Sequence, residues 1–455
     1  MKNHGRLLVL MSLILLQSCS QLTQSLTAEK ENHKLKVEIH KYKLDNGLKV
    51  LLIPNRRMPL ISYYTQFEIG GRFERKGETG ATHFLEHMLF KGTSRFADGT
   101  FERILDENGG VNNAYTENDS TTYYENFPSY LLEQILEMES DRMQNLVISP
   151  AAFENERKVV FEERKMRFEN SPEGILYHQA VKDYFKGTNY ESSIIGEESD
   201  LKSLTPEKLM NFYHTYYRPN NATLVIAGDF ELTKLKKLID EKYSVIKANP
   251  EIEKLKKEID RDEAYVINAQ LGRQVDLKFE NENLIFSILT PGFKASDDKA
   301  LVLDLLLSTI NGGGSSYLTQ KYVLNSQSPL TYLNHYNLKF KKSGAILLMG
   351  EMVKGKDFAH FKNEFLTRFP DMCREAVTEK ALQKSKNQYL TRGFEHLKSN
   401  SGMAQLYLGH EAIFNDYNQG KKNFERILKM QTSEVLELCL ELFSPDKVLV
   451  HTISK

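Results

Sequence analysis

Two histidines four residues apart, His83 and His87, place the strongest single constraint on how this chain can fold. Residues four apart lie on the same face of an α-helix, so both imidazoles can reach one cation if this segment is helical. Glu86 lies between them in the sequence and near the same face. A carboxylate there can accept a proton from a metal-activated water without being a ligand itself. The segment around these residues is therefore predicted to be a metal-binding helix.

The order of the three residues, H-x-x-E-H, reverses the commoner H-E-x-x-H zinc motif. A pentapeptide of this kind also arises by chance in a chain of 455 residues with 12 histidines. An isolated histidine is more often a hydrogen-bonded core or surface residue than a metal ligand. Catalytic zinc sites usually have three protein ligands, and a histidine pair is often completed by a carboxylate. The motif therefore calls for a third ligand from elsewhere in the chain.

A charged segment further along, residues 154–166, is expected to be helical, with apolar positions at Phe153, Val159, Val160 and Met166. Its sequence ERKVVFEE, together with H-x-x-E-H, resembles the pitrilysin, insulysin and mitochondrial processing peptidase family, the inverzincin zinc peptidases. The resemblance is to the bacterial form of that family in which one chain makes a single two-domain half.

This resemblance implies the ligand set of the metal. The family has a glutamate ligand at a characteristic interval beyond the second histidine, and Glu163 stands at that interval after His87. The neighbouring Glu162 does not, and it is expected to be an ordinary solvated charge. One Zn²⁺ per chain is thus expected on His83, His87 and Glu163.

The same resemblance implies a function. Glu86 is expected to be the general base of a zinc metalloendopeptidase that hydrolyses peptides or unfolded segments through a metal-activated water. The family has a second glutamate two helical turns before the ligand, which implies an auxiliary catalytic role for Glu156.

One alternative is a non-catalytic structural or assembly subunit of a peptidase-like complex, although such members typically lose motif residues. A metal enzyme acting on small molecules is a second alternative.

Residues 110–116, GVNNAYT, resemble a stretch that lies beside the zinc in the family. There it implies an edge strand to which a peptide substrate adds as a further strand, and backbone pairing of this kind suits broad specificity. A buried strand that turns into residues 121–124 is the alternative, and the residue types do not separate the two. The predicted substrate-binding residues in this stretch are Asn112, Asn113, Ala114, Tyr115 and Thr116.

The second half of the chain contains no H-x-x-E-H, but residues 311–318, NGGGSSYL, resemble a glycine loop of the family. This implies a flexible loop near the path of the peptide, with Gly313 and Gly314 contacting substrate. A phosphate-binding loop is the competing interpretation, but Lys321 is wrongly spaced for a Walker motif.

The second half also departs from the family pattern. Tyr317 and Val323 stand where the family often has arginines, and Tyr332 matches its substrate-binding tyrosine only if a short insertion is allowed. Family members enclose peptides between two two-domain halves, and this chain is one half. We therefore expect a dimer, preferably a heterodimer with a paralogue that supplies the missing arginine, and otherwise a homodimer.

The order of elements predicts an α+β fold of two duplicated α/β-sandwich-type domains, each a mixed or antiparallel sheet covered by helices. Helix, proline break and β-branched strand recur around Pro219 and Pro445, which stand a domain length apart in the chain. Together with the resemblance, this predicts half of a peptidase clamshell. Its parts are an N-terminal zinc-peptidase domain at 36–247, a linker at 248–264 and a homologous C-terminal domain without the zinc motif at 265–455.

Residues 1–19 have a basic start and a short apolar run, as in a signal peptide. The run ends in LQSC, which resembles a bacterial lipobox and implies lipidation of Cys19, followed by a tether at 20–35. The expected location is the bacterial cell envelope, with a lipid anchor, preferably in the outer membrane, as the only membrane contact and the protein facing the periplasm. A secreted or soluble periplasmic protein is the alternative.

Charge and cysteine content narrow the choice of partners. The formal net charge is −1 and no basic block is present, which argues against nucleic acid as a partner. Beyond Cys19, Cys373 and Cys439 have no Cys-x-x-Cys spacing, so a thiolate metal site is not expected. Whether these two cysteines form a disulfide is left open by the sequence.

Overall fold

The structure is a computed structural model that describes residues 37–262 and 270–455. Cys19, the predicted signal peptide and the predicted tether therefore lie outside the described residues.

The N-terminal half is built on a six-stranded sheet of order β1-β2-β6-β3-β5-β4. Its strands are β1 (His40–Lys43), β2 (Lys49–Pro54), β3 (Leu60–Phe67), β4 (Val111–Thr116), β5 (Thr121–Pro128) and β6 (Ala222–Gly228). Strand β6 is an apolar run in which every residue is buried, as its place inside the sheet requires. It pairs parallel with β2 and antiparallel with β3. Strand β4 pairs with β5 at the end of the order, so the predicted edge position of this segment is confirmed.

The C-terminal half is built on a five-stranded sheet of order β7-β11-β8-β10-β9. Its strands are β7 (Arg273–Lys278), β8 (Ile285–Pro291), β9 (Leu330–Lys339), β10 (Gly344–Met352) and β11 (Leu449–Ser454). Strands β11 and β7 are parallel, and the other neighbours in this sheet are antiparallel.

The two sheets correspond strand by strand once β1 is set aside. Each begins with one parallel pair, continues with antiparallel pairs and ends at an edge strand, β4 in the first and β9 in the second. Pro219 and Pro445 each begin a short 3₁₀ turn just before the equivalent strands β6 and β11. The predicted fold class, two duplicated domains with mixed sheets covered by helices, is confirmed.

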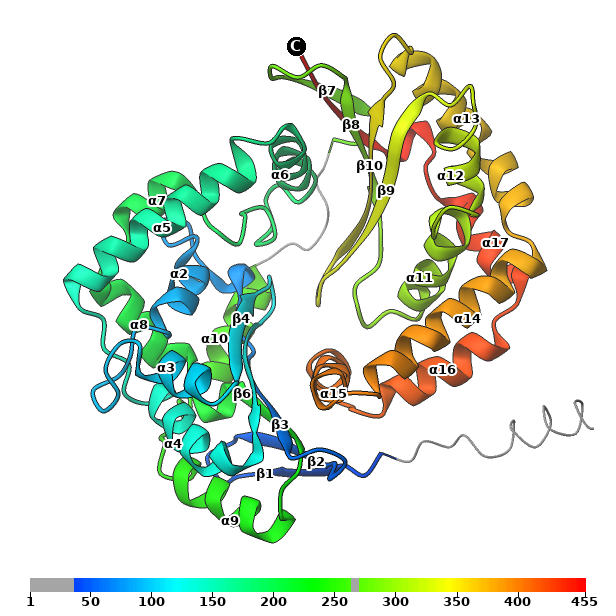
Figure 1. Cartoon of the computed structure of the whole chain (residues 1–455). Helices are drawn as coiled ribbons and strands as arrows, with labels where there is room; N and C mark the ends of the chain where they lie inside the picture. The colour runs from blue at the N-terminus through cyan, green and yellow to red at the C-terminus, as the bar shows by residue number, and fades with distance from the viewer. Residues whose placement is uncertain (1–36, 263–269) are drawn as a thin grey trace, which may run out of the picture. The chain divides into compact units, whose positions relative to one another are not determined.

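Each sheet carries its own helices along one face (Figure 1). The helices of the N-terminal half are α2 (Ala81–Met88), α3 (Thr100–Glu107), α4 (Leu132–Arg142), α5 (Pro150–Phe168), α6 (Pro172–Tyr184), α7 (Glu198–Ser203), α8 (Pro206–Tyr216), α9 (Leu232–Tyr243) and α10 (Ile252–Asp262). Those of the C-terminal half are α11 (Asp298–Asn311), α12 (Tyr317–Tyr322), α13 (Phe358–Ala376), α14 (Glu379–His396), α15 (Asn400–Phe414), α16 (Gln419–Lys429) and α17 (Thr432–Glu441). Helix α10 occupies most of the segment predicted to be the linker. None of the described helices is both long and apolar enough to span a lipid bilayer.

The second face of each sheet is covered by a helix from the other half. Helix α6 packs on β8 and β11, where Leu176 and Tyr184 join an apolar cluster with Leu289 and Leu347. Helix α15 packs on β3 and β6, and Ser401 Oγ lies 2.6 Å from Tyr64 Oη. Because α6 and α15 hold equivalent places in the two element orders, this exchange of helices is reciprocal.

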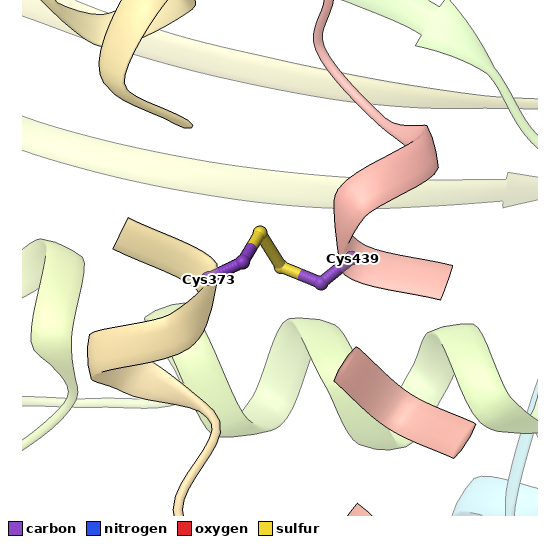
Figure 2. Close-up of a disulfide and its surroundings, with 2 residues drawn as sticks. All are labelled: Cys373 and Cys439. Carbon is purple, nitrogen blue, oxygen red and sulfur yellow. A yellow bond between two sulfur atoms is a disulfide. The ribbon is translucent and has the colours of Figure 1, made fainter. Parts of the chain in front are cut away.

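Cys373 on α13 and Cys439 on α17 form a disulfide, which settles the pairing that the sequence leaves open (Figure 2). Both residues are buried in the apolar core of the C-terminal half. The bond joins positions 66 residues apart in the chain.

Removing this disulfide is expected to destabilise the C-terminal half. Closing a loop of 66 residues restricts the unfolded chain, so the double variant Cys373→Ala/Cys439→Ala should lose about 4 kcal/mol of unfolding free energy. Denaturant unfolding with and without reductant measures this loss. Reductant should shift the midpoint of the wild type and leave that of the double variant in place. Equal midpoints for the wild type and the variant without reductant would contradict the expectation.

Candidate metal centre

Helix α2 begins at a glycine that no other residue could replace without strain. Gly80, its N-cap, has φ of 87°, and a Cβ there would lie 2.2 Å from the carbonyl oxygen of Ile195. The buried Glu74 carboxylate accepts hydrogen bonds from the backbone N–H groups of Gly80 at 2.7 Å and Thr82 at 2.6 Å. Burial raises the pKa of Glu74 to about 8, although these two donors favour its ionised form. Glu74 thus fixes the start of the helix that carries both histidines.

Helix α5 brings its carboxylates to α2. Ser149 caps its N-terminus by accepting from Ala152 N, and Pro150 stands at its first turn. The helix packs against α2, and the rings of Phe153 and Phe84 stack with centroids 4.8 Å apart.

The buried positions of α5 are Phe153, Glu156 and Val160. Val159 and Met166, two of the apolar residues of this segment, are instead 50% and 63% exposed. Two carboxylates, Glu156 and Glu163, occupy the packed face in their place.

Three side chains converge between α2 and α5. His83, His87 and Glu163 each offer one ligand atom, and these atoms lie within 4.8 Å of one another. Both Nε2 atoms lie 3.6 Å from Glu163 Oε2. Donors about 2.0–2.2 Å from a tetrahedral zinc ion lie about 3.3–3.6 Å from each other. The set therefore fits a zinc ion that keeps a fourth position open, and it is the one His/Cys/Asp/Glu group of this kind within residues 37–262 and 270–455.

Glu156 orients one of the imidazoles. Its Oε1 lies 2.8 Å from His87 Nδ1, and its Oε2 lies 3.0 Å from Lys91 Nζ. We assign the hydrogen to Nδ1, since only an N–H can donate to a carboxylate, and this leaves a lone pair on Nε2 for a metal. Nδ1 of His83 is buried and has no hydrogen-bond partner in the described chain. Glu156 thus supports the ligand His87 without entering the ligand set.

The pKa shifts of His83 and Glu163 suit a cation, whereas that of His87 goes the other way. Burial lowers the pKa of His83 to about 4, so its ring is neutral. Burial alone would also lower the pKa of His87, but Glu163 and Glu156 raise it overall. The hydrogen bond with His87 lowers the pKa of Glu163, which also pairs with Arg167 at 2.5 Å. Glu163 is therefore ionised, as a ligand must be.

The pKa of Glu86 is shifted in the opposite direction from that of Glu163. Burial raises the pKa of Glu86, and the charges of His87 and Glu163 also act on it. Its Oε2 accepts a hydrogen bond from the hydroxyl of Thr116, the last residue of β4. A carboxylate with a raised pKa beside a metal cluster has the chemistry of a general base.

The predicted substrate strand lies at the open edge of its sheet. Asn113 Oδ1 accepts from the backbone N–H of Ala114 at 2.8 Å, and Asn112 Nδ2 is buried without a partner in the described chain. Hydrogen bonds with Thr122 and Gln405 act on the Tyr115 hydroxyl, whose pKa is raised by burial. Thr116 alone of these residues is joined to the cluster, through Glu86.

The predicted substrate-binding residues of the second half lie on other elements, in the loop after α11 and on β9. Gly313 and Gly314 follow Gly312, which lines a cavity of the C-terminal half whose lining includes none of the three ligands. Tyr332 lies on β9, where burial raises its pKa and Glu173 and Glu351 add to the effect.

Three residues that support the site were not predicted from the sequence. They are Lys91, Arg167 and Glu74. Arg167 could have been found, because it stands four residues after Glu163 and therefore on the same face of α5. Lys91 gives no such signal, because α2 ends at Met88 and Lys91 lies in the turn that follows. Glu74 gives no such signal, since its loop reaches the start of α2 only in the folded chain.

Comparisons with known proteins find similarity to peptidases along most of the chain. The family model described as insulinase, peptidase family M16, matches residues 49–198, and the model described as the peptidase M16 inactive domain matches residues 203–389. The chain is 26% identical to the zinc protease PqqE of Helicobacter pylori over 88% of this chain and 89% of that protein. It is 29% identical to a probable mitochondrial-processing peptidase subunit beta of Arabidopsis thaliana over 46% of this chain and 39% of that protein.

Among solved structures, a protease from Helicobacter pylori has the same fold. Its TM-score is 0.83 at 23% identity, and the match covers 92% of this chain and 100% of that one.

Substitutions of two adjacent glutamates of α5, Glu162 and Glu163, should affect zinc affinity differently. Glu163→Gln removes a charged donor and should lower zinc affinity strongly, and Glu156→Gln should lower it about 10–100-fold by releasing His87. Glu162 is 68% exposed and paired with Lys165, so Glu162→Gln should bind zinc like the wild type. Titration of metal-free protein against a competing chelator measures all four affinities. Equal affinities for Glu162→Gln and Glu163→Gln would remove Glu163 from the ligand set.

Proposed function

The chain belongs to peptidase family M16, the insulinase family, and on this premise we propose that it is a zinc-dependent metalloendopeptidase acting on peptides or unfolded segments. The convergence of His83, His87 and Glu163 next to Glu86 carries the proposal. The zinc protease named among its relatives supports it.

The residues of the chain divide the chemistry between them. Zinc, when bound, would polarise the scissile carbonyl and lower the pKa of a water molecule. Glu86 would take the proton of the attacking water and deliver it to the leaving amine, and its raised pKa suits both steps. The Thr116 hydroxyl holds the Glu86 carboxylate in place. Glu156 and Lys91 keep His87 in the tautomer that presents Nε2.

The substrate would bind as an added strand on β4. The outer edge of β4 has no strand beside it in the described residues, and strand addition uses main-chain hydrogen bonds that do not depend on sequence. Asn112, Asn113, Ala114 and Tyr115 would line this edge. Because Thr116 ends the strand and contacts Glu86, a paired peptide would run toward the catalytic carboxylate.

The active species is proposed to be a dimer, preferably with a paralogue. Support comes from Tyr317 and Val323, which replace the arginines expected to stabilise the oxyanion, and from the relative named as a subunit. Full-rate cleavage by a monomeric preparation of this chain alone would contradict the dimer.

A cell-envelope location is proposed as well. The disulfide Cys373–Cys439 supports an oxidising compartment such as the periplasm. Labelling with a radioactive fatty acid, compared between the wild type and Cys19→Ser, tests the lipid anchor.

Substitution of the general base should separate catalysis from metal binding. Glu86→Gln keeps the size of the side chain but cannot accept the proton, so kcat should fall by at least about 100-fold while zinc stays bound. Cleavage of an unfolded polypeptide and zinc content are measured on the same samples, with and without the paralogue. Wild-type cleavage by Glu86→Gln would contradict the mechanism. Absence of cleavage by both proteins, with the paralogue present, would favour the non-catalytic role.

The acid limb of the pH profile of kcat/KM should move when the Thr116 hydroxyl is removed. Its hydroxyl donates to Glu86 and stabilises the ionised form, so its loss in Thr116→Val raises the pKa of Glu86 further. Because Glu86 must be ionised to accept a proton, activity would then be lost at a higher pH as the solution is acidified. The limb of kcat/KM should therefore move upward in Thr116→Val and stay in place in Thr331→Val on β9. A limb that stays in place or moves downward in Thr116→Val would contradict the role of this hydroxyl.

A further inference from the structure

The C-terminal half contains a cavity of about 480 Å³ that the proposed mechanism does not use. Helices α11, α14, α15 and α16 and strand β9 contribute to its walls. The lining of the cavity includes His335, Arg392, His396, Leu406, His410 and Phe424.

The cavity occupies the counterpart of the metal centre. In the duplicated order of elements, α11 corresponds to α2, the edge strand β9 to β4, and α14 to α5. The metal centre uses α2 and α5 and is joined to β4 through Thr116. The cavity is lined from α11, β9 and α14. The cavity thus stands on the elements of the duplicated domain that correspond to those of the metal centre, with different side chains.

These side chains do not suit a metal ion. Within the described ranges 37–262 and 270–455, the histidines of the cavity do not form a group close enough to hold one. Asp304, the carboxylate in the lining, already accepts from Lys339 Nζ at 2.6 Å and from Asn337 Nδ2 at 2.8 Å. Its charge is therefore offset by Lys339.

The cation in the lining of the cavity is Arg392. It is exposed and makes no hydrogen bond or ion pair with any described residue, although its charge acts on His335. Burial lowers the pKa of His335, and a hydrogen bond with the backbone of Asn311 and the charge of Asp304 oppose this effect. Nδ1 of His410 is buried without a hydrogen-bond partner in the described chain, whereas His396 is exposed.

Asn311 holds the ring of His335. Asn311 Oδ1 accepts from the Thr319 hydroxyl at 3.0 Å, and its Nδ2 donates to the Leu333 carbonyl at 3.0 Å. The same Nδ2 lies 3.4 Å from His335 Nδ1, and a hydrogen bond with the backbone of Asn311 acts on the same ring. His335 is therefore a wall residue that Asn311 already engages.

The rest of the lining is apolar and closely packed. Leu406 and the rings of Tyr389 and Phe424 form part of the wall. A Cβ at Gly393 would lie 2.2 Å from the Phe424 ring, and one at Gly420 would lie 2.6 Å from the His410 ring. The two glycines therefore let α14, α15 and α16 approach closely enough to enclose the site.

We infer that this cavity binds a peptide carboxylate, with Arg392 as the charged partner and the apolar wall holding the adjoining side chain. A guanidinium pairs with a carboxylate through two parallel hydrogen bonds. The carboxylate can be the C-terminus of a peptide or an Asp or Glu side chain. The inference rests on the proposed function for the source of this ligand, a substrate or product of the peptidase.

The test is a binding titration with the full chain carrying Glu86→Gln, so that the peptides stay intact. Three short peptides of one sequence are compared: one with a free C-terminal carboxylate, its amide, and an amide that ends in glutamate. The free acid or the glutamate peptide should bind at least about tenfold more tightly than the plain amide. The difference between these two identifies the source of the carboxylate.

Arg392→Gln, added to Glu86→Gln, should abolish the preference for a carboxylate. Arg368→Gln on α13 is the matched control, because Arg368 is another exposed arginine and lies outside the cavity lining, and it should keep the preference.

Equal binding of all three peptides, or an unchanged preference in Arg392→Gln, would overturn the inference. Tighter binding of inorganic phosphate than of either carboxylate peptide would overturn it as well. Hydrolysis by the Glu86→Gln protein would refute the proposed catalytic role instead, and the two failures are therefore distinguishable.

Discussion

The packing of α2 against α5 is the contact on which the rest of the site depends. The two histidines lie on one short helix, and their carboxylate partner lies far from them in the sequence, near the end of another helix. Phe84 stacked on Phe153, together with the buried Val160, fixes the spacing of the helices. With that spacing, Glu163 Oε2 lies 3.6 Å from the Nε2 atoms of both histidines. An apolar contact thus sets the geometry of a polar site.

The pKa values of the carboxylates around the two histidines shift in different directions because their surroundings differ. His87 lowers the pKa of Glu163, whereas burial raises the pKa of Glu86. The first suits a ligand that must stay ionised, and the second suits a group that gains and loses a proton. Glu156 stays ionised through His87 and Lys91 and serves to hold a ring. Environment, more than residue type, distinguishes the three roles.

The sequence predicted the elements of the site better than their packing. The metal helix and the duplicated order of elements could be predicted, because each depends on local spacing or on a repeat, whereas the edge position of β4 followed only from the resemblance to the family. Glu156 and Glu163 followed from the resemblance to the family and not from an apolar period, because two carboxylates stand on the face of α5 that meets α2. Val159 and Met166 are apolar but exposed, so apolar spacing alone does not indicate that face. The sequence left the pairing of Cys373 and Cys439 undecided because 66 residues separate them. Only the fold brings α13 to α17.

The central claim is that one zinc ion is held by a histidine pair from α2 and a carboxylate from α5. A crystal structure of the zinc-loaded protein, with anomalous scattering recorded at the zinc edge, tests it most directly. The account predicts a single anomalous peak about 2.0–2.2 Å from Nε2 of His83, Nε2 of His87 and a carboxylate oxygen of Glu163. A peak without Glu163 in its coordination, with another side chain in that position, would contradict it.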